Sequence, residues 1–211
     1  MFEVYATLMP HSRFTRPVPG IAVAGHYARG VASGTKATRL LRLEDAPELT
    51  QALTAQREFM APYEPVRDDD YYTVQGQTTL LSHLLDDRDQ GRVLPLVIVA
   101  PDGALAGRIT LNNIVRGPLQ SASLGYWVRR ELNGQGLATA AVAEALGIAF
   151  RELGLHRVEA GTLVDNVASQ RVLTKNGFSR YGLAPHYLRI AGRWQDHVLF
   201  QRLADDDSDD R

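Results

Sequence analysis

Residues 121–153, SASLGYWVRRELNGQGLATAAVAEALGIAFREL, join a β-strand pattern, a glycine-rich turn and a helical pattern. The first part of this stretch places Tyr126 and Val128 on one face of an extended segment, as a β-strand does. Gly134 and Gly136 follow, and then an apolar stripe begins at helical spacing. Backbone N–H groups at the start of a helix have no partner within the helix, and the helix dipole adds partial positive charge there. The stretch therefore predicts an anion-binding turn between a strand and a helix.

Length and composition fit one globular domain. The chain has 211 residues, 45% of them hydrophobic and 22% charged, and one core can serve a chain of up to roughly 250 residues. A net charge of −1 gives no electrostatic basis for binding nucleic acid, and the absence of cysteine excludes disulfides and thiolate sites. No apolar run approaches the about 20 residues that cross a bilayer. The first residues lack the pattern of a signal peptide, so we expect a cytoplasmic protein that does not bind membranes.

The chain divides into three expected segments. Residues 1–37 contain proline and glycine without sustained periodicity, which predicts a loose N-terminal arm, although a regulatory tail, a dimerisation arm or a misassigned start would look the same. Residues 38–203 carry the periodic patterns of a folded domain. Residues 204–211, ADDDSDDR, form an acidic tail that cannot bury enough apolar surface to fold.

The periodic patterns predict an α/β fold. The first elements in chain order are a strand from Thr38, a helix with Pro47 in its first turn that ends near Met60, and a helix capped by one of residues 68–70 and closed by Gly91. A three-strand meander follows over 93–128. The last elements are a helix over 136–153, a strand over 157–163, a helix over 166–176, and two final strands around the turn 191–192. This order predicts a central mixed, mostly antiparallel sheet of about seven strands with about four helices packed on it and one parallel crossover.

Two other phosphate-binding loops are excluded by the glycine pattern. The letters GQG could begin a dinucleotide fingerprint, but Thr139 occupies the position of the third glycine, and the candidate ribose-binding acid, Glu159, falls inside a predicted strand. No Gly-Lys-Ser/Thr follows at the spacing of a P-loop. The loop therefore binds its anion through a different arrangement.

Two motifs resemble the GNAT superfamily of N-acetyltransferases. Residues 133–138, NGQGLA, are similar to its acetyl-CoA loop, Arg/Gln-x-x-Gly-x-Gly/Ala, with Asn133 departing from the first position. Residues 165–178, DNVASQRVLTKNGF, are similar to its downstream helix, N-x-x-A/S-x-x-x-[Tyr/Leu]-x-K-x-GF. The resemblance covers about residues 38–203. Ser169, Leu173, the segment PYEP at 62–65 and the closing hairpin RIAGRWQDHVLF at 189–200 resemble the RimJ/RimL type, the ribosomal-protein alanine N-acetyltransferases.

The resemblance implies a GNAT fold with acetyl-CoA as the acetyl donor and no metal. The backbone around Trp127 and Val128 would pair with the pantetheine arm and offer an N–H to the thioester oxygen, and Asn166 would bind pantetheine or its surroundings. Ser169 would donate a proton to the departing sulfur, although a hydroxyl that bonds the preceding helical turn is the plain alternative. The pyrophosphate would lie on Asn133, Gly134, Gln135, Gly136, Leu137, Ala138 and Thr139.

The general base and the acceptor site are less well indicated. Many superfamily members carry glutamate where this chain has Ser123, and members of the ribosomal branch carry a Glu-Tyr pair that corresponds to His186 and Tyr187 here. His186 is therefore the candidate base, and histidine titrates near neutrality, which suits that task; a surface loop histidine is the alternative. Candidate acceptor-binding residues are Glu64, Asn113 and Tyr126.

The sequence thus predicts an N-acetyltransferase in which an amine attacks acetyl-CoA directly. The expected acceptor is the N-terminal amine of a protein, such as a ribosomal protein. A small amine, such as an antibiotic, a polyamine or an amino acid, is a second possibility. The departures at Ser123 and Asn133 also leave open a non-catalytic acyl-CoA sensor. Both a monomer and a homodimer are compatible with the sequence.

Overall fold

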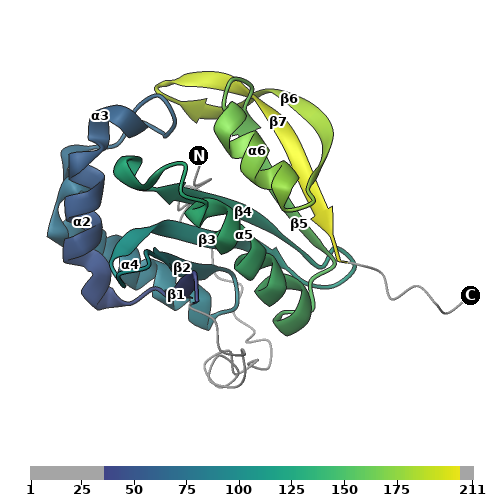
Figure 1. The fold of residues 1–211 in the computed structure, drawn as a ribbon, viewed down its shortest axis with the longest axis horizontal. Helices are drawn as coiled ribbons and strands as arrows, with labels where there is room; N and C mark the ends of the chain where they lie inside the picture. Colours follow the sequence, from purple (N-terminus) through teal and green to yellow (C-terminus); the bar gives the residue numbers. More distant parts are fainter. Residues whose placement is uncertain (1–35, 205–211) are drawn as a thin grey trace, which may run out of the picture.

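The computed structural model describes residues 36–204 and arranges them as a central sheet with helices on both faces (Figure 1). The predicted loose arm, except for residues 36 and 37, lies outside the described residues, as does the predicted acidic tail beyond residue 204. Across residues 36–204, none of the helices combines the length and the apolar character needed to span a membrane.

Seven strands form one sheet in the order β1-β2-β3-β4-β5-β7-β6, which confirms the predicted strand number. Neighbouring strands are antiparallel except for β4 and β5, which run parallel and are connected through a helix. This pair is the predicted parallel crossover. The strands are β1 (Thr38–Leu40), β2 (Leu94–Val99), β3 (Leu105–Val115), β4 (Ser121–Val128), β5 (Arg157–Leu163), β6 (Ser179–Ile190) and β7 (Arg193–Leu203).

The helices cover the two faces of the sheet. The crossover helix α5 packs on β2, β3 and β4, on the near face in Figure 1, and α6 packs against α5 and β5. Helices α2 and α4 pack on each other and on the opposite face. The α-helices are α2 (Ala46–Ala55), α3 (Arg57–Met60), α4 (Val74–Asp89), α5 (Leu137–Gly147) and α6 (Val167–Lys175).

Alternation along β4 builds a core on each face of the sheet. Leu124, Tyr126 and Val128 are buried in the larger core beneath α5. Trp127, between two of them, is buried in a second core with residues of α2 and α4. Because successive side chains of a strand point to opposite faces, this one strand anchors both helical layers. The end of β4 at Val128 is therefore packed between helices on both faces.

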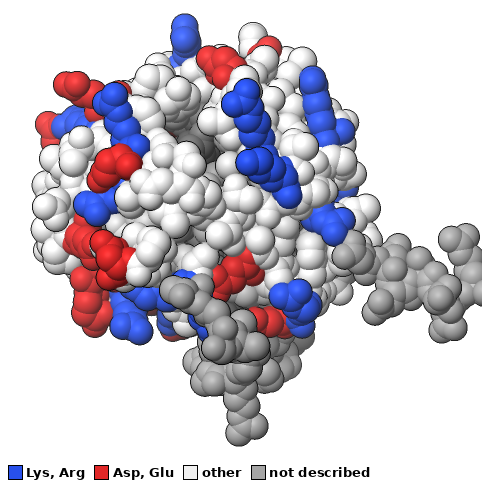
Figure 2. Space-filling view, viewed as in Figure 1, with Lys and Arg blue, Asp and Glu red and all other residues white. Residues whose placement is uncertain are grey.

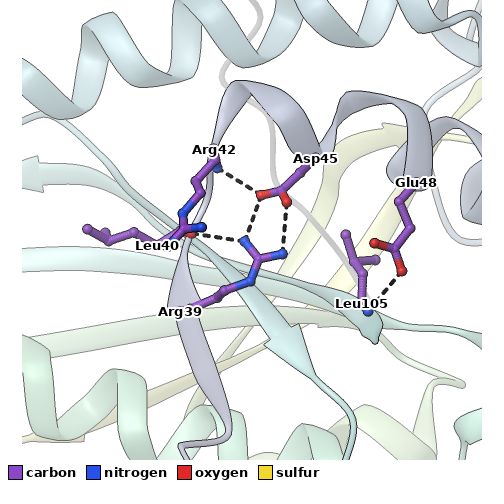
Figure 3. Close-up of polar contacts among 6 residues, drawn as sticks. All are labelled: Arg39, Leu40, Arg42, Asp45, Glu48 and Leu105. Carbon is purple, nitrogen blue, oxygen red and sulfur yellow. Dashed lines mark hydrogen bonds and ion pairs between the residues drawn. The ribbon is translucent and has the colours of Figure 1, made fainter. Parts of the chain in front are cut away.

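Polar contacts fix α2 to the sheet (Figure 3). The guanidinium of Arg39 on β1 donates two hydrogen bonds of 2.8 Å to the carboxylate of Asp45, which also accepts the Arg42 backbone N–H at 2.8 Å. The hydrogen bond to Asp45 raises the pKa of Arg39. Glu48, one turn into α2, accepts the backbone N–H of Leu105 on β3 at 3.0 Å. The start of α2 is thereby tied to two strands.

Three helix bounds differ from those predicted. The predicted helix to Met60 breaks at Gln56, whose buried side chain accepts the Arg130 backbone N–H at 3.3 Å. Helix α4 begins after Thr73, whose hydroxyl accepts the Gly76 N–H, so the cap predicted within residues 68–70 belongs instead to a short 3₁₀ turn. The crossover helix is regular only to Gly147 and ends in a π-helical turn over residues 148–152. The first two differences arise from a tertiary contact and a capping contact that helical periodicity does not encode.

Candidate active site

Strands β4 and β5 diverge toward their carboxyl ends. Their backbone pairing extends only from Ser121↔Arg157 to Ser123↔Glu159, although β4 continues to Val128 and β5 to Leu163. Beyond Ser123, β4 therefore has no pairing with β5 within the described sheet. Backbone groups on such an unpaired edge can bind an extended ligand by strand-like hydrogen bonds. Trp127 and Val128 lie in the part of β4 that has no pairing with β5.

A cavity of about 360 Å³ lies where β4 ends. Figure 2 shows the molecule hollowed at this position. Three parts of the chain enclose the cavity. They are α3 with the residues that follow it, the loop between β4 and α5, and α6. The lining residues are Phe59, Met60, Tyr63, Val128, Leu132, Asn133, Gly134, Gly136, Leu137, Ala138, Thr139, Asn166, Ala168, Ser169, Arg171, Val172 and Lys175.

The glycines of the loop leave the helix start open. Gly134 and Gly136 have φ values of +78° and +83°, in the left-handed region that favours glycine. No heavy atom of the described chain lies within 4 Å of the position that a Cβ would take on either residue. Gly136 is the N-cap of α5, so the first N–H groups of that helix face this open space. A phosphate group fits the arrangement both sterically and electrostatically.

Helix α6 brings a buried hydroxyl into the cavity. The side chain of Asn166 caps the helix, its Oδ1 accepting the Ser169 backbone N–H at 3.1 Å. Ser169 is only 3% exposed, and its Oγ lies 2.8 Å from the hydroxyl of Tyr126 on β4. Burial raises the pKa of Tyr126, so its phenol stays protonated. The 2.8 Å contact of Ser169 Oγ therefore joins α6 to β4, whereas an ordinary helix-surface hydroxyl bonds only the preceding turn.

The side-chain nitrogen of Asn166 also indicates that this cavity binds a ligand. Its Nδ2 is buried and has no hydrogen-bond partner among residues 36–204. A buried amide donor without a partner costs about 1–3 kcal/mol. Because Asn166 lines the cavity, a ligand carbonyl there would accept this hydrogen bond. The amides of a pantetheine arm supply such a carbonyl.

Positive charge lies along one wall of the cavity. Arg171 and Lys175 follow one another along α6 and are exposed, and Figure 2 shows basic side chains over this helix beside the hollow. The signal for Lys175 was present in the sequence, because the residue belongs to the motif of residues 165–178. No sequence pattern indicated that Phe59, Met60 and Tyr63 line the cavity. Their position follows from the break at Gln56 of the helix that was predicted to reach Met60.

Two of the predicted cofactor-binding residues, Trp127 and Gln135, do not line the cavity with their side chains. The side chain of Trp127 is buried on the face opposite α5, which leaves only its backbone for the predicted role. Gln135 lies in the loop, but its side chain is not part of the cavity lining and donates to the Glu131 carbonyl at 3.4 Å.

The predicted acceptor residue Glu64 is close to the cavity without lining it. It follows Tyr63, which does line the cavity, and its carboxylate accepts the Tyr72 hydroxyl at 3.1 Å. Burial, and then the charge of Glu64, raise the pKa of Tyr72 to about 12. Arg67 lies 4.0 Å from the same carboxylate. Glu64 thus forms part of a polar group beside the cavity wall.

The structure does not bring Asn113 and His186 into the cavity. Asn113 is exposed in an irregularity of β3, near the beginning of β4, whereas the cavity lies at the end of β4. His186 is exposed on β6 with a φ of +48°, and its backbone N–H donates to the Asp196 carboxylate at 2.8 Å. Both assignments stay predictions. Within residues 36–204, no three side chains of the types that bind metal come together.

A family model and individual relatives match most of the chain. The model described as acetyltransferase (GNAT) domain matches residues 38–179. A probable N-acetyltransferase of Bacillus subtilis, YjcK, is 37% identical over 170 residues, which are 80% of this chain and 94% of the relative. The ribosomal protein uS5-alanine N-acetyltransferase of Escherichia coli is 32% identical over 162 residues, which are 76% of this chain and 84% of the relative.

A solved structure supports the same relationship. Mycobacterium smegmatis RimJ in complex with CoA-disulfide superposes with a TM-score of 0.76 and 36% sequence identity. The match covers 79% of this chain and 81% of that protein. The similarity in fold therefore covers about four fifths of each chain.

Proposed function

The chain belongs to the GNAT acetyltransferase family and is an acetyl-CoA-dependent N-acetyltransferase, and from this premise we propose that its acceptor is the N-terminal amine of a protein. The observation that carries the proposal is the similarity, over three quarters of the chain, to an enzyme named for acetylating the alanine of ribosomal protein uS5. The similarity to RimJ, solved in complex with CoA-disulfide at 36% identity, supports the CoA donor. A ribosomal protein is the example we expect.

Each part of the cavity has a proposed role toward acetyl-CoA. The loop over residues 133–139 binds the pyrophosphate through backbone N–H groups at the start of α5. The backbone of Trp127 and Val128 pairs with the pantetheine arm, and Asn166 donates its Nδ2–H to a pantetheine carbonyl. Arg171 and Lys175 contribute positive charge to the phosphate side. The acetyl group then lies between the ends of β4 and β5.

Ser169 is the proposed general acid. As the amine nitrogen bonds to the carbonyl carbon, the C–S bond breaks and its electron pair moves to sulfur. Ser169 gives its hydroxyl proton to that sulfur, His186 takes the proton that the amine loses, and Ser169 regains a proton from solvent. The products are an amide and a neutral thiol. An α-amine has a pKa of about 8, so roughly a tenth of it is neutral and available for attack at pH 7.

The acceptor class is tested with matched peptides. We expect a peptide with a free N-terminal alanine to be acetylated at its α-amine, and the same peptide with a blocked N-terminus and an internal lysine to remain unmodified. Release of free thiol gives the rate, and mass spectrometry of fragments gives the site. Spermidine, an aminoglycoside and free amino acids serve as the small-amine panel. A kcat/KM for any of these about tenfold above that of the best peptide would contradict the proposal.

His186 is the proposed base, and its replacement gives a test that depends on pH. In His186→Ala we expect kcat/KM to fall near neutral pH and to recover as the pH rises through the pKa of the acceptor amine, because a deprotonated amine needs no base. The measurement is kcat/KM for one peptide across a pH series. A profile that matches the unmodified protein at every pH removes His186 from the mechanism.

A further inference from the structure

Tyr126 is a buried titratable residue to which the proposed mechanism gives no part. It lies on β4, is 2% exposed, and projects from the sheet face that α5 covers. Its hydroxyl lies 2.8 Å from Ser169 Oγ and 3.4 Å from the Ser169 backbone carbonyl. Ser169 is separated from it by 43 positions in sequence. The contact therefore joins the strand that would hold the thioester to the helix that carries the general acid.

Ser169 is held from two directions. Asn166 Oδ1 accepts its backbone N–H at 3.1 Å, which fixes the first turn of α6. Tyr126 fixes the hydroxyl oxygen at the other end of the residue. Because both atoms are restrained and the side chain is buried, rotation of the Ser169 side chain about its Cα–Cβ bond is restricted. The position of Oγ is then fixed, and only the direction of the O–H bond remains to be determined.

The chemistry of the two hydroxyls decides that direction. Each hydroxyl carries one proton, so only one of the two can donate in this hydrogen bond. Two acceptors lie within reach of the Tyr126 proton, Ser169 Oγ at 2.8 Å and the Ser169 backbone carbonyl at 3.4 Å, and the shorter distance favours Oγ. A phenol is a stronger hydrogen-bond donor than an aliphatic alcohol, because it is the stronger acid. When Tyr126 donates to Ser169 Oγ, the proton of Ser169 is left to point elsewhere, and the open direction is the cavity.

We propose that Tyr126 is a positioning residue, which donates its hydroxyl proton to Ser169 Oγ in a hydrogen bond and so directs the Ser169 proton to the sulfur of the departing CoA. This inference rests on the proposed role of Ser169. Tyr126 keeps its own proton throughout, and the proton that reaches sulfur is that of Ser169. The same hydrogen bond stabilises the transient negative charge on Ser169 Oγ.

Kinetics and binding separate this role from a structural one. We expect Tyr126→Phe to lower kcat about tenfold, with the Kd for acetyl-CoA within twofold of that of the unmodified protein. Tyr181→Phe is the matched control, because the exposed Tyr181 also loses a hydroxyl hydrogen bond, to Glu159, but has no contact with Ser169. We expect this control to keep full activity. In a Ser169→Ala background, Tyr126→Phe should cause no further loss.

A second readout needs no turnover. A hydrogen bond from Ser169 to a bound thiolate lowers the pKa of the CoA thiol. Tyr126→Phe and Ser169→Ala should therefore each raise the thiol pKa of bound CoA. The ultraviolet absorbance of the thiolate measures this pKa. The kinetic cycle uses whichever amine the unmodified protein acetylates, so failure of the peptide acceptor leaves it intact. Full kcat in Tyr126→Phe, an equal loss in the Ser169→Ala background, or an unchanged thiol pKa would each overturn the proposal.

Discussion

Ser169→Ala is expected to lower kcat about 100-fold, which lies in the range that general acid catalysis contributes. The expectation follows from the position of Ser169, which is 3% exposed, lines the cavity and holds its Oγ 2.8 Å from the Tyr126 hydroxyl. Without this hydroxyl, the departing thiolate loses its proposed proton donor. The Kd for acetyl-CoA should change little, because the pyrophosphate and pantetheine contacts remain.

The control for this variant lies on the same helix. Thr174→Ala removes a hydroxyl that is exposed and bonds the Gln170 carbonyl at 2.9 Å, as helix-surface hydroxyls commonly do. We expect Thr174→Ala to retain the activity of the unmodified protein. Thiol release at saturating acetyl-CoA gives kcat for each variant. Equal kcat values for Ser169→Ala and Thr174→Ala would exclude Ser169 as the general acid.

Gly136→Ala is expected to weaken acetyl-CoA binding about tenfold or more. A Cβ on Gly136 would enter the open space at the start of α5, where the pyrophosphate is expected to approach the backbone. Alanine at a φ of +83° also costs about 1–3 kcal/mol of backbone strain. The variant therefore combines a loss of binding with a loss of stability, and these two effects must be separated.

Gly117→Ala makes that separation. Gly117 lies in the turn between β3 and β4 with a φ of +71°, and no described atom approaches the position of its Cβ. It therefore carries a similar strain away from the cavity. We expect both variants to lose similar free energies of unfolding in denaturant titrations, and only Gly136→Ala to lose affinity in calorimetric titrations with acetyl-CoA. Similar Kd values in the two variants would show that the loop does not hold the ligand through this position.

Local patterns predicted most of the fold. Alternating side chains in residues 93–128 are sufficient to indicate the three-strand meander, and the glycines before the apolar stripe indicate where α5 begins. The two motifs indicated the acetyltransferase family, which the family model and the relatives confirm. These features could be predicted because each depends on residues that are close together in sequence.

Contacts between distant residues could not be predicted in the same way. Gln56 interrupts a helical pattern because its side chain reaches Arg130, 74 positions away. This break lets α3 present Phe59 and Met60 to the cavity. Tyr126 and Ser169 likewise meet only when α6 packs beside β4. Neither contact follows from periodicity or from a short motif, because each depends on the packing of separate elements.

We propose that one acetyl-CoA site joins the loop at Gly136 to the hydroxyl of Ser169. A crystal structure of the protein with acetyl-CoA would show both contacts at once. We predict that the pyrophosphate lies against the backbone N–H groups that begin α5, and that the thioester sulfur lies within hydrogen-bond reach of Ser169 Oγ, between the diverging ends of β4 and β5. A complex in which the sulfur lies away from α6, with Ser169 still paired to Tyr126 and out of contact with the ligand, would contradict it.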